Sequence, residues 1–147
     1  MELLTLRRML PIDVKAVREL EALIFTDPWS EQGFYDAVNQ NNVLFAIAEV
    51  HRTIVGYCGM YCAFDEGEIT NVAVAPTDRQ KGIAGKLVAY LLETAKEMKI
   101  HQIVLEVRIS NIHAIHLYEK LGFKKEGIRQ NFYTLPKEDA YVMILHQ

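Results

Sequence analysis

The sequence has little of what stabilises secreted or metal-dependent proteins. It contains two cysteines, Cys58 and Cys62, which lie four residues apart in an apolar segment typical of a β-strand. At that spacing both side chains point the same way, but they are too far apart for an unstrained disulfide. Neither cysteine has a histidine at the spacing of a zinc site. We therefore expect two reduced, buried thiols and no metal cofactor.

An excess of one charge and a long hydrophobic run are missing as well. The 16 basic and 19 acidic residues leave a net charge of −3, whereas bulk binding of nucleic acid needs a basic excess. The most apolar run, residues 43–48, is too short to span a bilayer, and the first residues do not resemble a signal peptide. We expect a cytoplasmic protein that binds neither a membrane nor nucleic acid directly.

The residues that are present predict one α/β domain over residues 1–147. Half of them are hydrophobic, which is enough for a sizeable core. Apolar periodicity predicts the order β-α-α-β-β-β-α-β-α-β-β, and hence one central mixed β-sheet flanked by helices, with a right-handed β-α-β crossover. We expect strands over 4–8, 43–50, 54–64, 68–74, 102–108, 123–130 and 139–146, and helices over 13–24, after Ser30, over 85–98 and over 111–121.

Capping and helix-breaking residues mark several of these ends. Asp13 and Ser30 precede the two N-terminal helices and are suited to cap them. Pro28 breaks the chain between these helices. Gly122 is suited to end the last helix, because glycine adopts the left-handed conformation of a helix C-terminus.

The most informative segment is RQKGIA, residues 79–84, which joins a predicted strand to an amphipathic helix. A glycine-containing turn at this point presents free backbone N–H groups at the positive end of a helix, an arrangement that binds phosphate. Arg79 and Lys81 add positive charge. The segment has neither the spacing of a triphosphate-binding loop nor the three glycines of a dinucleotide fingerprint. We expect it to bind a pyrophosphate; an ordinary basic helix start is the alternative.

This segment resembles the R/Q-x-x-G-x-G/A turn of the GNAT acyltransferases, which hold acetyl-coenzyme A there. Residues 111–123 resemble the family pattern N-x-x-A-x-x-x-Y-x-x-x-G-F. Residues 28–30, 71–74, 129–133 and 138–140 add a resemblance to the RimI branch of ribosomal-protein alanine N-acetyltransferases. The likeness covers nearly the whole chain. It implies a GNAT fold in which two parallel strands splay apart at the cofactor site, with acetyl-CoA as co-substrate.

The resemblance also implies which residues hold the cofactor. The pyrophosphate is expected at residues 80–85, and backbone groups of the strand before the turn are expected to meet pantetheine as a neighbouring strand would. An asparagine side chain is expected on the pantetheine arm, although helix capping explains this residue almost as well. The expected cofactor-binding residues are Val72, Ala73, Val74, Arg79, Gln80, Lys81, Gly82, Ile83, Ala84, Gly85 and Asn111.

Transfer of acetyl from a thioester to an amine requires loss of an amine proton, stabilisation of the carbonyl oxygen and departure of a thiolate. Glu106, in mid-strand between apolar neighbours, is the expected base, since burial raises a carboxyl pKa. RimI-like enzymes have a glutamate with this role at the matching position. The alternatives are a solvent-facing Glu106 or one paired with Arg108 or a cross-strand base. Glu68 is the competing base, or else a residue that helps hold the substrate amine.

Tyr118 is the expected general acid. A phenol can donate a proton to a departing thiolate, and the family has this tyrosine beside the thioester sulfur. The alternative is a core tyrosine on an amphipathic helix. Trp29, Glu68 and Tyr133 are the expected substrate-binding residues. The resemblance implies that the peptide enters beside Trp29 and Tyr133, and Glu68 would help hold the substrate amine. A core position is the alternative for Trp29.

The resulting hypothesis is an N-acetyltransferase acting on the N-terminal α-amine of a protein. The resemblance implies a small-subunit ribosomal protein that begins with alanine. One alternative is acetylation of a small-molecule amine, because the motifs specify the donor better than the acceptor. Another is a CoA-binding module without catalysis, which would need neither Glu106 nor Tyr118.

Overall fold

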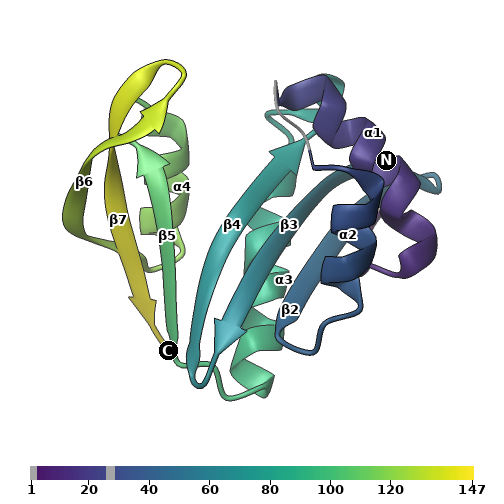
Figure 1. Ribbon diagram of the computed structural model, residues 1–147, viewed down its shortest axis with the longest axis horizontal. Helices are drawn as coiled ribbons and strands as arrows, with labels where there is room; N and C mark the ends of the chain where they lie inside the picture. The colour runs from purple at the N-terminus through teal and green to yellow at the C-terminus, as the bar shows by residue number, and fades with distance from the viewer. Residues whose placement is uncertain (1–2, 26–28) are drawn as a thin grey trace.

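The computed structural model describes residues 3–25 and 29–147, so the predicted break at Pro28 lies outside the described residues. The strands form one mixed sheet in the order β1-β2-β3-β4-β5-β7-β6 (Figure 1). This architecture confirms the predicted α/β class and element order. The strands are β1 (Leu4–Arg8), β2 (Val43–Val50), β3 (Thr53–Ala63), β4 (Glu66–Val74), β5 (Gln102–Arg108), β6 (Lys124–Thr134) and β7 (Lys137–His146).

Helices cover both faces of the sheet (Figure 1). On one face lie α1 (Val14–Ile24) and α2 (Glu31–Val38), and on the other lie α3 (Ile83–Glu97) and α4 (Ile112–Lys120). Two short 3₁₀ turns, Pro11–Asp13 and Pro76–Asp78, precede α1 and α3. None of the helices in the described part of the chain is long and apolar enough to cross a membrane.

The core under α3 follows from its apolar periodicity. Leu87, Leu91 and Ala95 recur every four residues and are fully buried against the sheet. Burying one such leucine contributes roughly 1.5–3 kcal/mol. Cys58 lies in the same core as a free, buried thiol, as predicted, whereas Cys62 is free but only partly buried.

The core on the opposite face is aromatic. Trp29, Phe34, Phe45, Tyr57 and Tyr61 contact one another with ring centroids 5.3–6.5 Å apart, and we call these five residues the aromatic cluster. Tilted and edge-on contacts of this kind are the favoured geometry for aromatic pairs. The ring of Phe45 lies over Gly59, where a Cβ atom would come within 2.1 Å of it, so only glycine fits.

A bulge bends β4 in the middle of the sheet. Ile69 pairs with Met60 on β3, and the next pair joins Asn71 to Gly59, so Thr70 is an extra residue without a partner. A bulge of this type bends its strand and increases the local twist. The second half of β4 therefore turns away from the line of its first half.

The consequence is that β4 and β5, which are parallel, separate. They are paired only from Glu66–Gln102 to Glu68–Val104 and diverge beyond that point (Figure 1). The carboxyl ends of parallel strands are where α/β sheets bind ligands. The predicted splayed pair is thus confirmed, and it opens toward the segments that begin α3 and α4.

Most helix ends agree with the prediction, but one does not. Ser30 caps α2 by accepting from the Gly33 N–H at 3.0 Å, and Gly122 ends α4 with a φ of 104°. Asp13 occupies the N-cap position of α1, as predicted, but its side chain makes no capping hydrogen bond to that helix. Its carboxylate instead accepts from the Leu10 N–H and binds the Arg7 guanidinium at 2.8 Å, because that cation on β1 lies within reach.

Candidate active site

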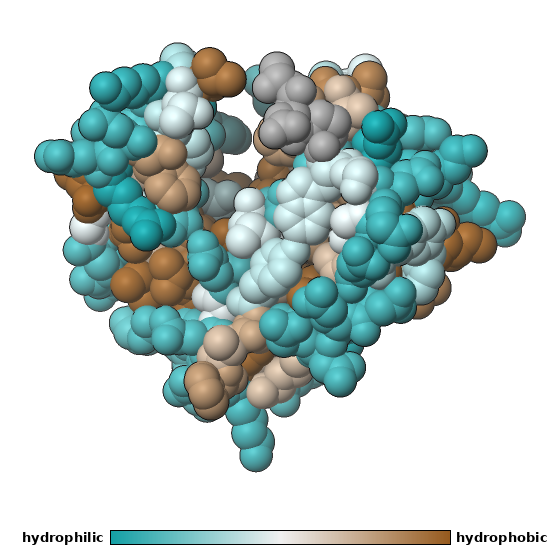
Figure 2. Space-filling model, viewed as in Figure 1, coloured by the Kyte–Doolittle hydropathy of each residue, from teal (hydrophilic) through white to brown (hydrophobic). Residues whose placement is uncertain are grey.

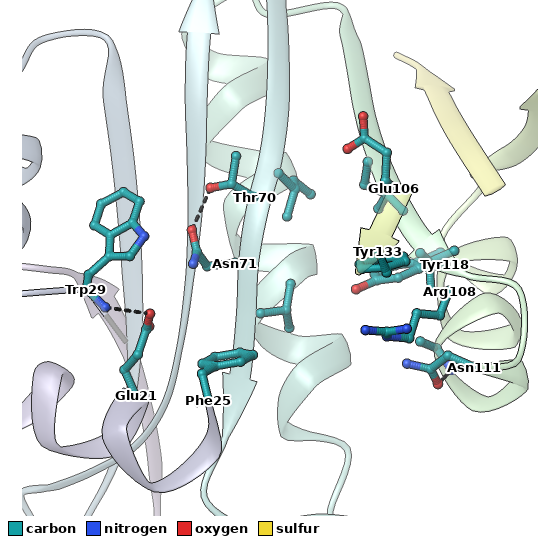
Figure 3. Close-up of a pocket in the computed structure, with 15 residues that line it drawn as sticks. Glu21, Phe25, Trp29, Thr70, Asn71, Glu106, Arg108, Asn111, Tyr118 and Tyr133 are labelled. Atoms are coloured by element: carbon teal, nitrogen blue, oxygen red, sulfur yellow. Dashed lines mark hydrogen bonds between the residues drawn. The ribbon is translucent and has the colours of Figure 1, made fainter. Parts of the chain in front are cut away.

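A cleft of about 500 Å³ fills the gap between β4 and β5. Figure 2 shows it as a hollow between the two halves of the sheet, and Figure 3 shows three sides: the α1–α2 region, β4, and β5 with its neighbours. The lining residues are Glu21, Phe25, Trp29, Ile69, Thr70, Asn71, Val72, Leu105, Glu106, Val107, Arg108, Asn111, Ala114, Tyr118 and Tyr133. Six predicted site residues thus meet here: Trp29, Val72, Glu106, Asn111, Tyr118 and Tyr133.

Glu106 lines the cleft from the middle of β5, between Leu105 and Val107, which line it as well. Leu105 and Val107 are buried in the α3 core, and Glu106 points to the opposite face of β5. Its side chain is only 12% exposed and receives a hydrogen bond from Arg129 Nη1 at 3.1 Å. The alternative that Glu106 pairs with a base on another strand is therefore met by Arg129 on β6, and Glu106 lines the cleft at the same time.

The pKa of Glu106 is raised, first by burial and then by the negative charge of Glu68, while Arg129 opposes the shift. Glu68 is opposite Val104 in the parallel register, and Val104 is on the same face of β5 as Glu106. Glu68 itself is exposed and is not among the lining residues. The two candidate carboxylates are thus neighbours, with Glu106 the more buried.

Tyr118 comes from α4 and closes the cleft from the side of the α3 core. Its ring packs edge-on against Phe123 at 5.8 Å. Burial, followed by Cys58 and Tyr133, raises the pKa of Tyr118 to about 12. In the part of the chain that the structure describes, no group accepts a hydrogen bond from its hydroxyl, which is thus available to a ligand in the cleft.

Asn111 has the two functions that the sequence left open. Its Oδ1 accepts from the Ala114 N–H at 3.2 Å and so caps α4. The same side chain lines the cleft (Figure 3). Capping occupies the oxygen, and the amide NH₂ remains available for a ligand.

The turn before α3 is shaped as a phosphate-binding turn requires. Gly82 is the N-cap with a φ of 76°, and Gln80 has a φ of 64°. No described side chain caps this helix start, so its first-turn N–H groups, including those of Ile83, Ala84 and Gly85, are open to an anion. These residues do not line the cleft between the strands; they follow β4 at the same edge of the sheet.

The two basic residues of this turn are held within it. Arg79 Nε donates to the Val74 carbonyl at 3.1 Å, and Lys81 Nζ lies 3.3 Å from Asp78. Val74 is buried in the α3 core and Ala73 in the core that contains the aromatic cluster. Side chains at both positions are therefore structural, and only backbone groups there are suited to a ligand.

One wall of the cleft is the β6–β7 hairpin, which Arg108 ties to the end of β5. The guanidinium lies over the Tyr133 ring at 4.1 Å and donates to the Leu135 and Pro136 carbonyls at 3.1 and 2.9 Å. It also pairs with Glu138 at 3.1 Å. These contacts hold the half-buried Tyr133 against the cleft (Figure 3), and burial raises its pKa.

The opposite wall contains a residue that sequence reasoning missed. Glu21 on α1 is 2% exposed and lines the cleft together with Phe25 and Trp29. Burial raises its pKa. A signal was available, because Glu21 falls on the apolar stripe of α1 formed by Val17 and Leu20.

Comparison with known proteins agrees with this geometry. The profile of the acetyltransferase (GNAT) family matches residues 14–123. A Bacillus subtilis relative named as a candidate [ribosomal protein bS18]-alanine N-acetyltransferase is 37% identical over 93% of this chain and 91% of its own length. The Escherichia coli (strain K12) [ribosomal protein bS18]-alanine N-acetyltransferase is 31% identical over 90% of each chain.

Solved structures agree with the same assignment. The Escherichia coli ribosomal-protein-S18-alanine N-acetyltransferase superposes with a TM-score of 0.89 at 29% identity, over 98% of this chain and 94% of that one. Ard1 from Thermoplasma volcanium has a TM-score of 0.84 at 25% identity, over 97% of each chain. The predicted GNAT fold and RimI-like resemblance are confirmed, and the chain belongs to the acetyltransferase (GNAT) family of N-acetyltransferases.

Proposed function

We propose that this enzyme transfers acetyl from acetyl-CoA to the N-terminal α-amine of a protein, and that the N-terminal alanine of a small-subunit ribosomal protein is its acceptor. The observation that carries the proposal is the meeting of Glu106 and Tyr118 in one cleft between two separated parallel strands. The names of the relatives support the acceptor. A ribosomal-protein substrate also supports the expected action in the cytoplasm.

Acetyl-CoA would bind along the diverging ends of β4 and β5. The uncapped start of α3 would receive the pyrophosphate, with Arg79 and Lys81 beside it. The pantetheine arm would lie between the strands, where β4 is no longer paired with β5 beyond Glu68. Asn111 would donate its amide to that arm, and the Val72 N–H would polarise the thioester carbonyl.

Glu106 would act as the base. An α-amine has a pKa near roughly 8, so it is mostly protonated at neutral pH. Its proton moves to Glu106, and the free nitrogen attacks the thioester carbonyl carbon. Because each pKa unit corresponds to about 1.36 kcal/mol, the raised pKa of Glu106 lowers the free energy of this proton transfer. Glu68 would attract the ammonium form to the same place.

Tyr118 would assist the leaving group. The C–N bond forms, the C–S bond breaks, and the phenolic proton stabilises the departing sulfur. A pKa of about 12 keeps this phenol protonated at cellular pH. A thiolate in the same buried cleft is destabilised for the same reason, so its own pKa rises and it accepts the proton more readily. The acylated nitrogen loses its second proton to solvent. The proton on Glu106 then returns to the tyrosinate through solvent, and the site is restored.

The acceptor would enter between the α1–α2 wall and the β6–β7 hairpin. Trp29 and Tyr133 line these two sides with large, amphipathic rings. A slot of this kind suits an extended N-terminus with a small first residue. A lysine side chain would lose more rotamer entropy on entering, and its amine, with a pKa near roughly 10.4, is harder to deprotonate.

Release of the CoA thiol tests the proposal. We expect turnover with a peptide that begins with alanine and much less with the same peptide blocked at its N-terminus. In Glu106→Gln we expect turnover to fall by about 10²-fold. Efficient turnover with free small amines but not with the peptide would favour a small-molecule acetyltransferase. CoA binding without turnover of any amine would favour a binding module.

A further inference from the structure

We infer that Glu21 is a positioning residue that fixes the acceptor wall of the cleft. The inference rests on the proposed function, since it concerns the wall against which the peptide N-terminus would lie. Glu21 is buried and lines the cleft, yet the transfer of acetyl described above does not use it.

The carboxylate of Glu21 joins three separate parts of the chain. It is on α1, and one oxygen accepts a hydrogen bond from the Tyr57 hydroxyl on β3. The other oxygen accepts from the Trp29 N–H ahead of α2 at 3.3 Å (Figure 3). Both partners are donors, so the ionised form satisfies both contacts. One side chain therefore ties the helix, the sheet and the Trp29 backbone together.

The surroundings of Glu21 do not compensate its charge. Within residues 3–25 and 29–147, no lysine, arginine or histidine pairs with it. Asp13, the other buried acidic residue, has Arg7 as a partner. A buried carboxylate without a cation is held only by its hydrogen-bond donors, so the Glu21 contacts decide where its partners lie.

The contacts of Trp29 transmit this position to the wall. Its ring packs on Phe34 at 5.3 Å, Tyr61 at 6.3 Å and Phe45 at 6.4 Å. Tyr57, the second partner of Glu21, packs on Phe34 and Phe45 as well. The backbone of Trp29 is thus fixed by Glu21 and its ring by the aromatic cluster, and Tyr57 belongs to both sets of contacts.

The experiment uses Glu21→Gln, Tyr57→Phe and the double variant, with Asp13→Asn as a control at the buried acid outside the cleft. The glutamine keeps the shape of the side chain and one acceptor oxygen. Its NH₂ group, however, replaces the oxygen that accepted from either the Tyr57 hydroxyl or the Trp29 N–H, so one of these two hydrogen bonds is lost. We expect a peptide KM about tenfold higher in Glu21→Gln, corresponding to about 1.4 kcal/mol, with the KM for acetyl-CoA and kcat nearly unchanged. Because Glu21 and Tyr57 act through one hydrogen bond, the increase in peptide KM in the double variant is expected to be smaller than the two single effects combined.

Trp29 provides an independent readout, because it is the only tryptophan in the chain. Glu21→Gln and Tyr57→Phe should shift its emission in the free enzyme and raise the peptide concentration that half-saturates the emission change. Asp13→Asn should lower thermal stability without either effect. If the wild-type enzyme acetylates the peptide, unchanged Trp29 emission and unchanged peptide KM in both Glu21→Gln and Tyr57→Phe would overturn the role of Glu21. A wild-type enzyme that does not acetylate the peptide would instead contradict the proposed function.

Discussion

The two sides of the cleft are built in different ways. On the donor side, the contacts that shape the phosphate turn and the α4 cap join residues three to five positions apart, such as Arg79–Val74 and Asn111–Ala114. On the acceptor side, the contacts that join separate elements include pairs 23 and 36 positions apart, Arg129–Glu106 and Tyr57–Glu21, beside the shorter Trp29–Glu21 link. Short segments therefore determine donor binding, whereas distant pairs shape the acceptor wall.

This difference indicates that the two sides can change independently. A local turn keeps its geometry wherever the strand and helix around it are kept. The acceptor walls depend on packing among α1, β3 and the β6–β7 hairpin. A small number of substitutions there can therefore change acceptor binding without disturbing cofactor binding. The variants below separate reacting groups, donor side and acceptor side.

Tyr118→Phe should have the largest effect on turnover. It removes a group that takes part in the reaction itself, after acetyl-CoA and the acceptor have both bound. The phenylalanine keeps the packing on Phe123 but removes the proton donor. We expect kcat to fall on the order of 10² to 10⁴-fold, with CoA affinity by calorimetry unchanged. Tyr90→Phe, on α3 and outside the cleft, serves as the control. Near wild-type turnover in Tyr118→Phe would show that the thiolate leaves unaided.

Glu106→Gln should follow, with a loss nearer to about 10²-fold, because part of an α-amine is already neutral near pH 8. In the wild type, kcat/KM should decline as pH falls through the raised pKa of Glu106, where the base becomes protonated. In Glu106→Gln this decline should be absent. The rate should instead rise with the fraction of neutral amine until the pH reaches the pKa of the amine. Glu49→Gln is the control. An unchanged pH profile would assign the base to Glu68.

Gly82→Val tests the donor side alone. At a φ of 76° a β-branched residue costs about 1–3 kcal/mol, and a Cβ atom there meets no protein atom within 4 Å. We expect CoA affinity to fall by about tenfold or more, equal to about 1.4 kcal/mol, because the turn changes shape. Gly122→Val, also at positive φ, should lower stability but not affinity. If folded Gly82→Val binds CoA with the same affinity as the wild type, the turn before α3 does not bind the pyrophosphate.

Arg108→Lys should have the smallest effect and should be confined to the acceptor side. Lysine keeps the charge but not the fork that reaches Leu135 and Pro136, nor the same stacking on Tyr133. We expect a peptide KM about threefold to fivefold higher, or roughly 1 kcal/mol, with an unchanged KM for acetyl-CoA. Arg7→Lys is the control away from the cleft. A change in both KM values would show that the two sides are coupled.

The same contrast explains what could be predicted from the sequence. Gly82 and Asn111 were predictable because each belongs to a short motif, and Glu106 because strand alternation points it away from its apolar neighbours. The link between Glu21 and Tyr57 was not, because no local pattern indicates that a carboxylate on the apolar stripe of α1 meets a hydroxyl 36 positions away.

The interaction of Asp13 was mispredicted for a related reason. A carboxylate before a helix is suited to cap it, but β1 brings Arg7 within 2.8 Å. A charged partner competes with the local N–H groups, and only the fold shows which contact forms. The Thr70 bulge is similar, since its consequence, the parting of β4 from β5, depends on pairing across the sheet.

The most direct test of the central claim offers both amines in one molecule. A peptide with a free N-terminal alanine and an internal lysine is incubated with the enzyme and acetyl-CoA, and tandem mass spectrometry locates the acetyl group. The account predicts acetyl on the α-amine of alanine, with the lysine unmodified at early times. Acetyl found mainly on the lysine ε-amine would contradict it.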